Sequence, residues 1–402
     1  MKRHLLFLFF AIITFTALAN VTISGHVKST ATQYAIADAE VRVTGSKISV
    51  ITNEDGYFSL KLEKMPKSLN ISALGHRNKI LDCSTITDAD NVLVWLQPDS
   101  HMLAAVTVYS AEDIVMSALD KIPQNFTNRS ERLSCFYRET VRKQNHYTNI
   151  KEAVMDVFKT DYAHDITRDK VQIIKGRSLI SQKSKDTLSV KVMGGPQESV
   201  LIDHVKNRET LFYPDDLPAY EFEMGESTTI DDRLQFVINF HPHDVRDYPL
   251  YSGTIYIDVE RLAFTRIETT LDMSDVGKAV RFMLVKKPKG LRFRPRALNT
   301  VVSYHYDGEF SRISYVRNTY LFNCDWKKRL FATSYRVVSE MVVTDYREEE
   351  VPKTRKNMFS HYDVLSSDVA DFNDPEFWND YNIIEPSESL ESAVKRLKKR
   401  AQ

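Results

Sequence analysis

Short β-strand patterns separated by turn residues fill the first quarter of the sequence, and they constrain its fold more than any other feature. Residues 21–109 contain runs rich in Val, Ile, Leu and aromatic residues, with Gly, Asn, Asp and Pro between them. The runs are VTISGHV, AEVRVTG, KISVIT, YFSLKL, LNISAL, KILDC and NVLVWL. Seven strands in a segment of this length suit two packed antiparallel sheets. The pattern therefore predicts a mainly β protein that begins with a seven-stranded Greek-key β-sandwich over residues 20–108.

The acidic turn Asn53–Gly56 raises the question of a metal site, because four successive residues here include three with side-chain oxygens. An EF-hand loop that places its invariant glycine at Gly56 would start at Ile51 and end at Leu62. Neither residue offers an oxygen ligand. We therefore interpret the stretch as the corner of a β-hairpin, in which Gly56 supplies the positive φ that a tight turn requires.

Four motifs in this region carry a resemblance to a known family. They are Ser24–Val27, Ala37–Val43, Thr52–Leu60 and Ile71–His76. In this order they resemble the carboxypeptidase-regulatory-like domain, which has a transthyretin-like β-sandwich fold, although His76 stands where that family usually has an aromatic residue. The resemblance implies a non-catalytic module. In exported proteins of Bacteroidetes type, such a module often precedes periplasmic or outer-membrane domains.

The N-terminus has the pattern of a secretory signal peptide over residues 1–19. Lys2 and Arg3 precede an apolar run over Leu5–Phe15, and Ala17–Ala19 forms a small-residue cleavage site. The run is shorter than the ~20 residues of a membrane-spanning helix, so an uncleaved anchor is the less favoured alternative. We therefore expect an exported protein, periplasmic or associated with the outer membrane, without a transmembrane span after cleavage.

The charge balance and the number of cysteines argue against two classes of protein, nucleic-acid-binding proteins and disulfide-stabilised scaffolds. The chain has 54 basic and 54 acidic residues, and removal of Lys2 and Arg3 with the signal peptide makes it slightly acidic. A balance of this kind argues against nucleic-acid binding, which requires a basic face. Cys83, Cys135 and Cys324 are too few for a disulfide framework. One disulfide with one free thiol, or three buried thiols, are both compatible with the sequence.

A linking helix is predicted within residues 109–130. Ser110 can cap it, with Asp113 in the reciprocal position of a capping box, and Pro123 lies near its end. The helical spacing of apolar residues defines one face: Ile114, Val115, Ala118, Leu119 and Ile122.

Longer strand patterns follow, and they predict a large antiparallel β domain over residues 131–350. The expected hairpins pair 252–258 with 263–268, Arg281–Lys286 with Leu291–Pro295, and 297–306 with 310–322, and the strand 330–346 follows them. Short turns between consecutive strands favour one curved sheet with few helices. Residues 351–402 form an acidic and aromatic segment and a C-terminal helix that starts at Pro386. Its basic end, Lys395–Arg400, is either a solvated helix terminus, which we favour, or a contact with an anionic membrane.

Two further resemblances lie in this second region. Gly253–Asp258 and Arg266–Glu268 resemble a hairpin in the half-barrel sheets of lipoprotein-carrier-like periplasmic proteins. Phe136–Glu139 and Phe377–Asn382 are similar to segments of Bacteroidetes proteins of unknown function that begin with the regulatory-like module. The second resemblance brings no known chemistry.

Motifs for catalysis are missing from the sequence, and we assign no catalytic, cofactor-binding or metal-binding residue. No histidine is followed by Glu at the third position, which argues strongly against zinc carboxypeptidase chemistry. His241 and His243 could share a metal with Asp244 or Asp247, but a polar loop is the favoured interpretation. The carboxylate pairs Asp215–Asp216 and Asp231–Asp232 and the glycines of Gly194–Pro196 occur in sequence typical of turns.

The sequence thus favours a non-enzymatic binding or structural role at the cell envelope, without a cofactor. Its hypothetical ligand is a lipid acyl chain or a peptide on the concave face of the large sheet. The aromatic residues that motivate this hypothesis, and that could equally form ordinary core, are Tyr304, Tyr306, Phe310, Tyr315, Tyr320 and Phe322. The alternatives are a hydrolase that acts on glycans or peptides through paired carboxylates, and a scaffold that docks onto an outer-membrane protein.

Overall fold

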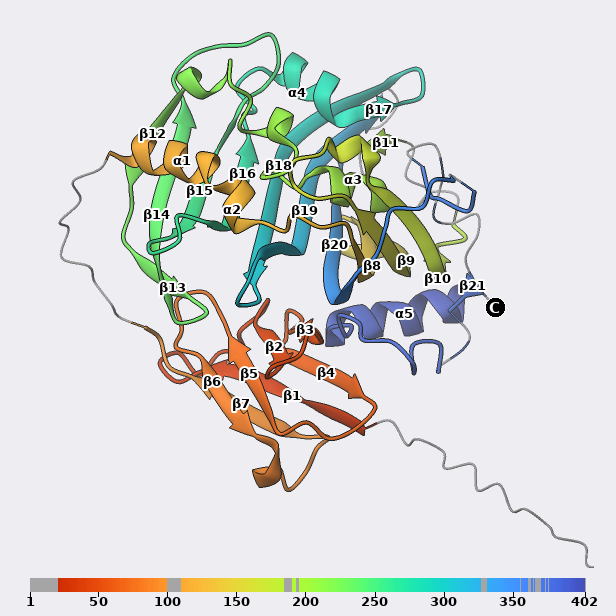
Figure 1. The fold of residues 1–402 in the computed structure, drawn as a ribbon. Coiled ribbons are helices and arrows are strands. Elements are labelled where there is room, and N and C mark those ends of the chain that lie inside the picture. The colour runs from red at the N-terminus through yellow and green to blue at the C-terminus, as the bar shows by residue number, and fades with distance from the viewer. Residues whose placement is uncertain are drawn as a thin grey trace, which may run out of the picture.

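The structure is a computed structural model. It describes residues 21–99, 110–183, 190–192, 195–326, 331–354, 356–360, 363, 365, 370–372, 374 and 376–401. The predicted signal peptide, residues 1–19, lies outside the described residues. An N-terminal sandwich packs below a much larger sheet, and a few helices cover the larger sheet (Figure 1). The fold is therefore mainly β, as the sequence predicts.

The sandwich contains the seven predicted strands. They are β1 Val21–Ser29, β2 Glu40–Val43, β3 Ser49–Ile51, β4 Tyr57–Leu62, β5 Ser68–Ser72, β6 Lys79–Asp82 and β7 Val92–Leu96, with a short 3₁₀ helix η1 at Cys83–Thr85. The sheet β4-β1-β7 faces the sheet β3-β2-β5-β6, and a common core of Ile, Val, Leu and Phe side chains fills the space between them. One expectation was wrong, because β1 and β7 pair in parallel. At that pair Gly25 permits the close approach, since an added Cβ would lie 1.9 Å from Val92 O.

The turn at Asn53–Gly56 is not the corner of a hairpin. Strand β3 belongs to one sheet and β4 to the other, so the turn carries the chain from sheet to sheet. Asn53 Oδ1 shapes it by accepting hydrogen bonds from the backbone N–H groups of Asp55, at 2.9 Å, and Tyr57, at 3.0 Å. Gly56 has a φ of 70°, as predicted. The local turn chemistry was readable from the sequence, but the partner of each flanking strand was not.

The large sheet has twelve strands and is antiparallel except where β21 joins β10. Its spatial order is β12-β14-β15-β16-β18-β19-β20-β8-β9-β10-β21, and β13 also pairs with β14. The bounds are β8 Glu131–Lys143, β9 His146–Lys159, β10 Lys170–Ile180, β12 Tyr220–Met224, β13 Thr228–Ile230, β14 Arg233–Pro242, β15 Tyr251–Asp258, β16 Phe264–Leu271, β18 Leu291–Tyr306, β19 Ser311–Trp326, β20 Thr333–Glu348 and β21 Ala370–Asp371. The predicted hairpins β15–β16 and β18–β19 are both present.

The predicted hairpin between Arg281–Lys286 and Leu291–Pro295 was wrong. Residues Val276–Met283 form helix α4, and β17, Leu284–Lys286, pairs with β11, Lys191–Val192, rather than with β18. Asp275 caps the helix by accepting a hydrogen bond from Lys278 N at 3.0 Å. The turn between β17 and β18 is therefore present, but the two strands beside it do not pair with each other. Turn residues alone do not reveal whether the flanking strands form a hairpin.

Helices cover one face of the large sheet (Figure 1). They are α1 Ala111–Asp120, α2 Ile122–Asn125, α3 Pro196–Leu201 and α4, with 3₁₀ helices η2 Ile166–Arg168, η4 Arg208–Thr210 and η5 Leu217–Ala219. The predicted capping box between Ser110 and Asp113 is present. The apolar side chains of α1 join the main core under the sheet, where Ile114 is 2% exposed. The predicted linking helix is thus packed into the larger unit.

The C-terminal segment lies on the opposite face of the large sheet. There its motif Phe377–Asn382 packs against the motif Phe136–Glu139 of β8, so the two motifs that resemble segments of Bacteroidetes proteins are in contact. Phe136 and Trp378 pack edge to face with 5.7 Å between ring centroids. Arg138 Nη2 donates to Ile384 O at 2.6 Å. The buried Glu152 accepts hydrogen bonds from Arg138 Nε at 2.8 Å, Arg177 Nε at 2.7 Å and Trp378 Nε1 at 3.1 Å. A largely buried cluster of ion pairs and hydrogen bonds therefore fastens this segment to the sheet.

Helix α5, Glu388–Ala401, follows that segment and lies beside the sandwich (Figure 1). Its apolar residues Leu390 and Leu397 are buried, as the predicted stripe requires. The Asn53–Gly56 turn contacts the start of this helix, because Asp55 Oδ2 accepts a hydrogen bond from Glu388 N at 2.7 Å. A carboxylate beside a helix N-terminus also matches the positive end of the helix dipole.

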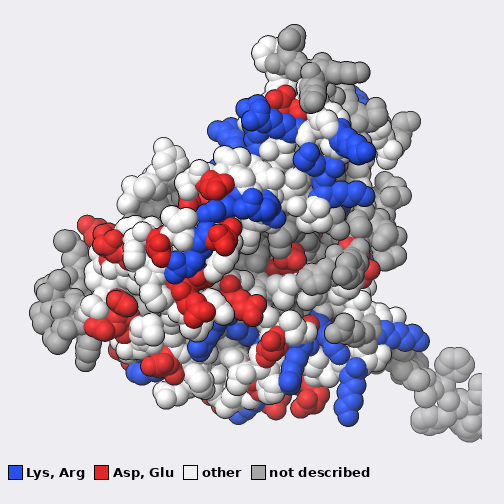
Figure 2. All heavy atoms as spheres, turned by 90° about the horizontal axis from the view of Figure 1, so that it is seen from above, with Lys and Arg blue, Asp and Glu red and all other residues white. Residues whose placement is uncertain are grey.

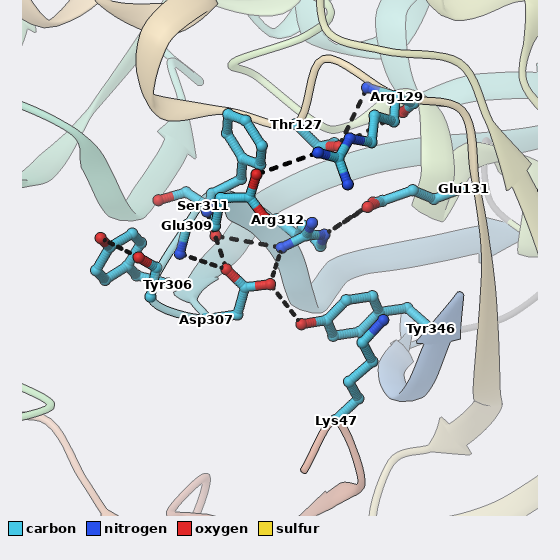
Figure 3. Close-up of polar contacts among 12 residues, drawn as sticks. Lys47, Thr127, Arg129, Glu131, Tyr306, Asp307, Glu309, Ser311, Arg312 and Tyr346 are labelled. Atoms are coloured by element: carbon cyan, nitrogen blue, oxygen red, sulfur yellow. Dashed lines mark hydrogen bonds and ion pairs between the residues drawn. The ribbon is translucent and has the colours of Figure 1, made fainter. Parts of the chain in front are cut away.

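A second contact between the two units lies at the tip of the β18–β19 hairpin (Figure 3). Asp307 Oδ2 accepts a hydrogen bond from Tyr346 OH at 2.8 Å. The same carboxylate forms an ion pair with Arg312. Arg312 Nε also donates to Glu131 Oε1 at 2.8 Å. Lys47 of the sandwich lies over the Tyr346 ring, with Nζ 4.5 Å from the centroid. Burial opposes ionisation of Asp307, but backbone and side-chain hydrogen bonds outweigh it and lower its pKa to about 2.

Candidate functional site

A cavity of about 380 Å³ lies between the large sheet and the segments that cover it. This volume is within the range of ~300–1,000 Å³ that is typical of small-molecule sites. The lining is largely apolar and aromatic, and comprises Glu198, Leu201, Ile202, His204, Asn207, Glu209, Thr210, Leu211, Asp216, Tyr220, Tyr248, Pro249, Leu250, Tyr251, Phe282, Met283, Leu298, Thr300 and Tyr320. The large sheet therefore does enclose a space that could hold a ligand.

Two neighbouring strands, β18 and β19, form the floor of the cavity. Leu298 and Thr300 are two residues apart on β18, so their side chains point to the same side of the sheet. Tyr320 lies opposite Leu298 on β19 and is 4% exposed. Thr300 Oγ1 donates to Asn318 Oδ1 at 2.9 Å, so its hydrogen is engaged within the sheet. Regular strand pairing thus fixes the position of the floor.

A buried network of charges holds the segment that covers the floor. Asp203 Oδ2 lies 2.8 Å from Lys159 Nζ, and Asp203 Oδ1 accepts a hydrogen bond from Tyr304 OH at 2.9 Å. Lys206 Nζ lies 2.7 Å from Asp169 Oδ1. Two lysines and two aspartates therefore neutralise each other away from water, as buried charges require. Burial and the neighbouring Lys159 lower the pKa of Lys206 to about 8.

His204 lies within the same segment and lines the cavity instead of joining the charges. Its side chain is buried, with 2% exposure, and Nδ1 is 2.8 Å from Thr210 Oγ1. Thr210 already donates its hydroxyl hydrogen to Asn207 O at 2.7 Å. Because Thr210 can then only accept, Nδ1 must carry the proton of the neutral ring and Nε2 must be an acceptor. Burial lowers the pKa of His204 to about 4, so the ring is neutral at physiological pH.

Nε2 of His204 is buried and has no hydrogen-bond partner among the described residues. Buried polar atoms without partners are rare in folded proteins and often mark a functional position. The ring of Tyr251 packs against the imidazole, with 6.4 Å between centroids. The cavity therefore combines an apolar wall with a buried, neutral histidine side chain.

Acidic groups are the charged part of the lining. Asp216 accepts hydrogen bonds from Tyr248 OH at 2.7 and 2.9 Å and from Arg246 Nε at 3.3 Å. Glu198 and Glu209 are the other charged lining residues, and no Lys or Arg is among the described residues that line the cavity. Hydrogen bonds from Tyr248 and Arg246 therefore fix the position of the Asp216 side chain in the cavity lining.

The predicted polar candidates lie in separate environments. His241 Nε2 is 3.3 Å from Glu221 Oε2, whereas His243 Nε2 is 3.0 Å from Pro218 O. Asp244 forms an ion pair with Arg246. Within the described ranges, no group of three or more His, Cys, Asp or Glu side chains is placed to hold a metal ion. Each histidine therefore has its own protein partner.

The other predicted residues also have structural positions. Asp231 and Asp232 accept hydrogen bonds from the sandwich residues Asn70 and Asn78, so this carboxylate pair lies at the contact between the two units. All three cysteines are buried and unpaired: Cys83, Cys135 and Cys324. Gly195 directly precedes α3, and Gly194 lies outside the described residues.

The aromatic residues proposed as a ligand-binding face do not share one face. Tyr320 lines the cavity, but Tyr304 donates to Asp203, Tyr315 packs beneath the C-terminal segment, and Phe322 stacks on Tyr335. Sequence reasoning missed His204, because an isolated histidine carries no motif. Its only sequence signal was its place between Asp203 and Lys206, a pattern common in exposed turns.

A smaller space of about 100 Å³ lies between the sandwich and the large sheet. Its lining includes Glu40 and His305, whose Oε2 and Nδ1 atoms are 3.3 Å apart. Paired polar side chains in so small a volume indicate a packed contact between the two units. The larger cavity is therefore the better candidate for a ligand site.

Figure 2 shows Lys and Arg side chains next to Asp and Glu side chains over much of one face. This interspersed pattern does not form a continuous basic surface on that face. No helix in the described part of the chain is both long and apolar enough to cross a membrane.

Comparison with solved structures finds similar chains at low identity. A DUF1329 family protein from Desulfovibrio piger is 7% identical, with 61% of this chain and 95% of that chain covered and a TM-score of 0.27. MucB in complex with MucA(peri) is 10% identical, with 60% and 99% covered and a TM-score of 0.18. A putative membrane-associated protein of unknown function from Bacteroides fragilis is 13% identical, with 81% and 97% covered and a TM-score of 0.16. At these TM-scores the similarities carry no argument about function.

No curated protein matches the chain significantly. A family model does match its N-terminal part, over the β-sandwich. Residues 23–108 match the CarboxypepD_reg-like domain, which confirms for this part of the chain the resemblance to the carboxypeptidase-regulatory-like family.

Proposed function

We propose that the protein is a non-catalytic binding protein of the cell envelope, and that its large sheet holds an apolar small molecule. The cavity over β18 and β19 is the observation that carries this proposal. Its volume of about 380 Å³ and its lining of Leu, Ile, Met, Phe and Tyr side chains suit an apolar guest. The N-terminal signal pattern and the regulatory-like module support the envelope location.

The shape of the site favours a small molecule over an extended peptide. Segments from α3 to η4, together with α4, cover the floor, so the space is bounded on two sides. A peptide bound by strand addition would instead need an open sheet edge. Leu298 of the floor and Leu201 of the cover provide apolar surface that a hydrocarbon chain would contact.

A non-catalytic role agrees with the chemistry of the lining. Asp216 is hydrogen-bonded by Tyr248 and Arg246, and His204 is neutral with its Nδ1 hydrogen bonded to Thr210. The nearby aspartates Asp169 and Asp203 are paired with buried lysines. A hydrolase would need two carboxylates that converge on a cleft, whereas the Asp216 carboxylate of the lining is already engaged by Tyr248 and Arg246.

Titration with N-phenyl-1-naphthylamine, a neutral dye that fluoresces in apolar surroundings, tests the proposal. Leu201→Trp places an indole in the cavity wall, so we expect dye affinity to fall by about tenfold, which corresponds to ~1.4 kcal/mol. Leu93→Trp is the matched control, because Leu93 is 51% exposed on β7 of the sandwich. Absence of saturable dye uptake by the wild-type protein, or equal affinities for all three proteins, would refute the proposal.

A further inference from the structure

The end of the large sheet opposite the sandwich is rich in Lys and Arg. Helix α4 and strand β17 lie at this end, and β18 begins there (Figure 1). Between Asp275 and Asp307 the sequence contains no Asp or Glu. It contains eight basic residues there: Lys278, Arg281, Lys286, Lys287, Lys289, Arg292, Arg294 and Arg296. A long run with one sign of charge gives this end of the molecule a positive potential.

Six of these side chains are exposed where β17 leads into β18. From Leu291 to Arg296, buried apolar residues alternate with exposed arginines, because successive side chains of a strand point to opposite faces. The turn before β18 adds Lys287 and Lys289, and β17 adds Lys286, all of them exposed. Together these three arginines and three lysines form the basic surface of the large sheet.

Most charges of the basic surface have no counter-charge within the protein. Arg294 is the exception, because its Nη2 lies 3.1 Å from Asp325 Oδ2 on β19. Lys287 Nζ donates a hydrogen bond to the backbone oxygen of Leu291 at 2.9 Å, which leaves its charge uncompensated. Among the described residues, no carboxylate forms an ion pair with the other five cations of the surface. Those five can therefore pair with an external anion.

Two exposed apolar side chains lie at the same end of the sheet. Val285 on β17 is 56% exposed, and Phe331, two residues before β20, is 82% exposed. In the sheet, Cys324 of β19 pairs with Thr333 of β20 and with Phe293 of β18. Phe331 therefore lies at the end where β18 begins. Exposed apolar side chains beside Lys and Arg are typical of surfaces that rest in the interface of a membrane.

We infer that this end of the large sheet binds the surface of an anionic lipid bilayer. The lysines and arginines pair with phosphate headgroups, and Val285 and Phe331 enter the boundary between headgroups and acyl chains. The basic end of α5 is less suited to this contact, because its apolar residues Leu390 and Leu397 are buried against the large sheet. The basic surface shares none of the described residues that line the cavity, so the inference goes beyond the proposed function.

Flotation of the full mature chain with lipid vesicles tests the inference. Vesicles with equal amounts of phosphatidylglycerol and phosphatidylcholine should bind the wild-type protein, and vesicles of phosphatidylcholine alone should not. An increase from about 0.1 M to about 0.5 M NaCl should weaken the binding, because salt screens attraction between exposed charges.

A triple variant, Lys286→Gln with Lys289→Gln and Arg292→Gln, removes half of the basic surface. Each cation near an anionic bilayer strengthens binding by roughly fivefold, so we expect the vesicle partition coefficient to fall by about 100-fold. The matched control removes the same charge from three exposed lysines of the sandwich and should change the coefficient by less than about twofold. Its substitutions are Lys64→Gln, Lys67→Gln and Lys79→Gln.

Phe331→Trp reports entry into the bilayer, because the emission of the added indole should shift to shorter wavelength when the protein binds. Failure of the wild-type protein to bind the anionic vesicles, equal losses in the two triple variants, or an unshifted emission of Phe331→Trp in the bound state would overturn the inference. Binding of soluble polyphosphate without binding of vesicles would also overturn it. Dye uptake by the cavity uses none of these residues, so it decides the proposed function separately.

Discussion

The protonation of His204 makes the stability of the large domain depend on pH. The ordinary pKa of a histidine is 6.5, and burial lowers that of His204 to about 4. Between these two values the unfolded chain binds a proton that the folded chain excludes, so stability must fall as the pH falls through this window. One pKa unit corresponds to about 1.36 kcal/mol, and the full loss, reached below pH 4, is therefore about 3 kcal/mol.

Urea unfolding of the wild-type protein and of His204→Gln at pH 7 and pH 5 measures this effect. Gln cannot be protonated in this range, so the variant should lack the contribution. From pH 7 to pH 5 we expect the wild-type free energy of unfolding to fall by about 2 kcal/mol more than that of the variant. Carboxylates such as Asp203 titrate in both proteins, so their effects cancel in the comparison. Equal pH dependence of the two proteins would refute the burial of a neutral His204.

Two further predictions concern the C-terminal segment. Glu152→Gln leaves the buried Arg138 and the half-buried Arg177 without their counter-charge, so we expect the urea midpoint to fall by an amount equivalent to about 3–5 kcal/mol. The exposed Glu350→Gln should change it by less than about 0.5 kcal/mol, and equal effects of the two substitutions would contradict the role of Glu152. Asp55→Asn weakens the contact with Glu388 N and should destabilise the start of α5 by about 1 kcal/mol. Faster amide hydrogen exchange in the first turn of α5 would show this, and unchanged exchange there would contradict it.

The parts of the fold that the sequence predicted correctly depend on local signals. The sandwich strands alternate and end at turn residues, and Ser110 with Asp113 marks the start of α1 through contacts only three residues apart. The Asp307–Gly308 turn positions β18 against β19 for the same reason, with a φ of 103° at Gly308. For α1 and the β18–β19 hairpin, neighbouring residues determine both the conformation and its partner, whereas in the sandwich they determine the strands but not their pairing.

The errors arose where distant residues decide the structure. The pattern of Arg281–Lys286 is that of a strand, but only Leu284–Lys286 form one, because the cap at Asp275 and packing against β18 place residues 281–283 in helix α4. The turn Asn53–Gly56 has predictable local geometry, yet long-range pairing places β3 and β4 in different sheets. Pattern alone cannot supply these pairings.

The candidate site was out of reach for the same physical reason. Its floor comes from β18 and β19, its cover from residues around His204 and from α4, and folding alone brings them together. The sequence did suggest a ligand on the large sheet, but it selected aromatic residues that lie on both faces. Only Tyr320 of that set lines the cavity. The acidic lining and the orientation of His204 depend on hydrogen bonds that a linear pattern does not show.

Native mass spectrometry of the protein purified from its own host tests the central claim most directly. The account predicts a co-purifying small molecule whose mass is lost on gentle activation, and whose extracted form is apolar. The bound fraction should fall in Leu201→Trp and remain unchanged in Leu93→Trp. A single unliganded mass at all activation energies, from a protein that also fails to take up the neutral dye, would contradict the claim.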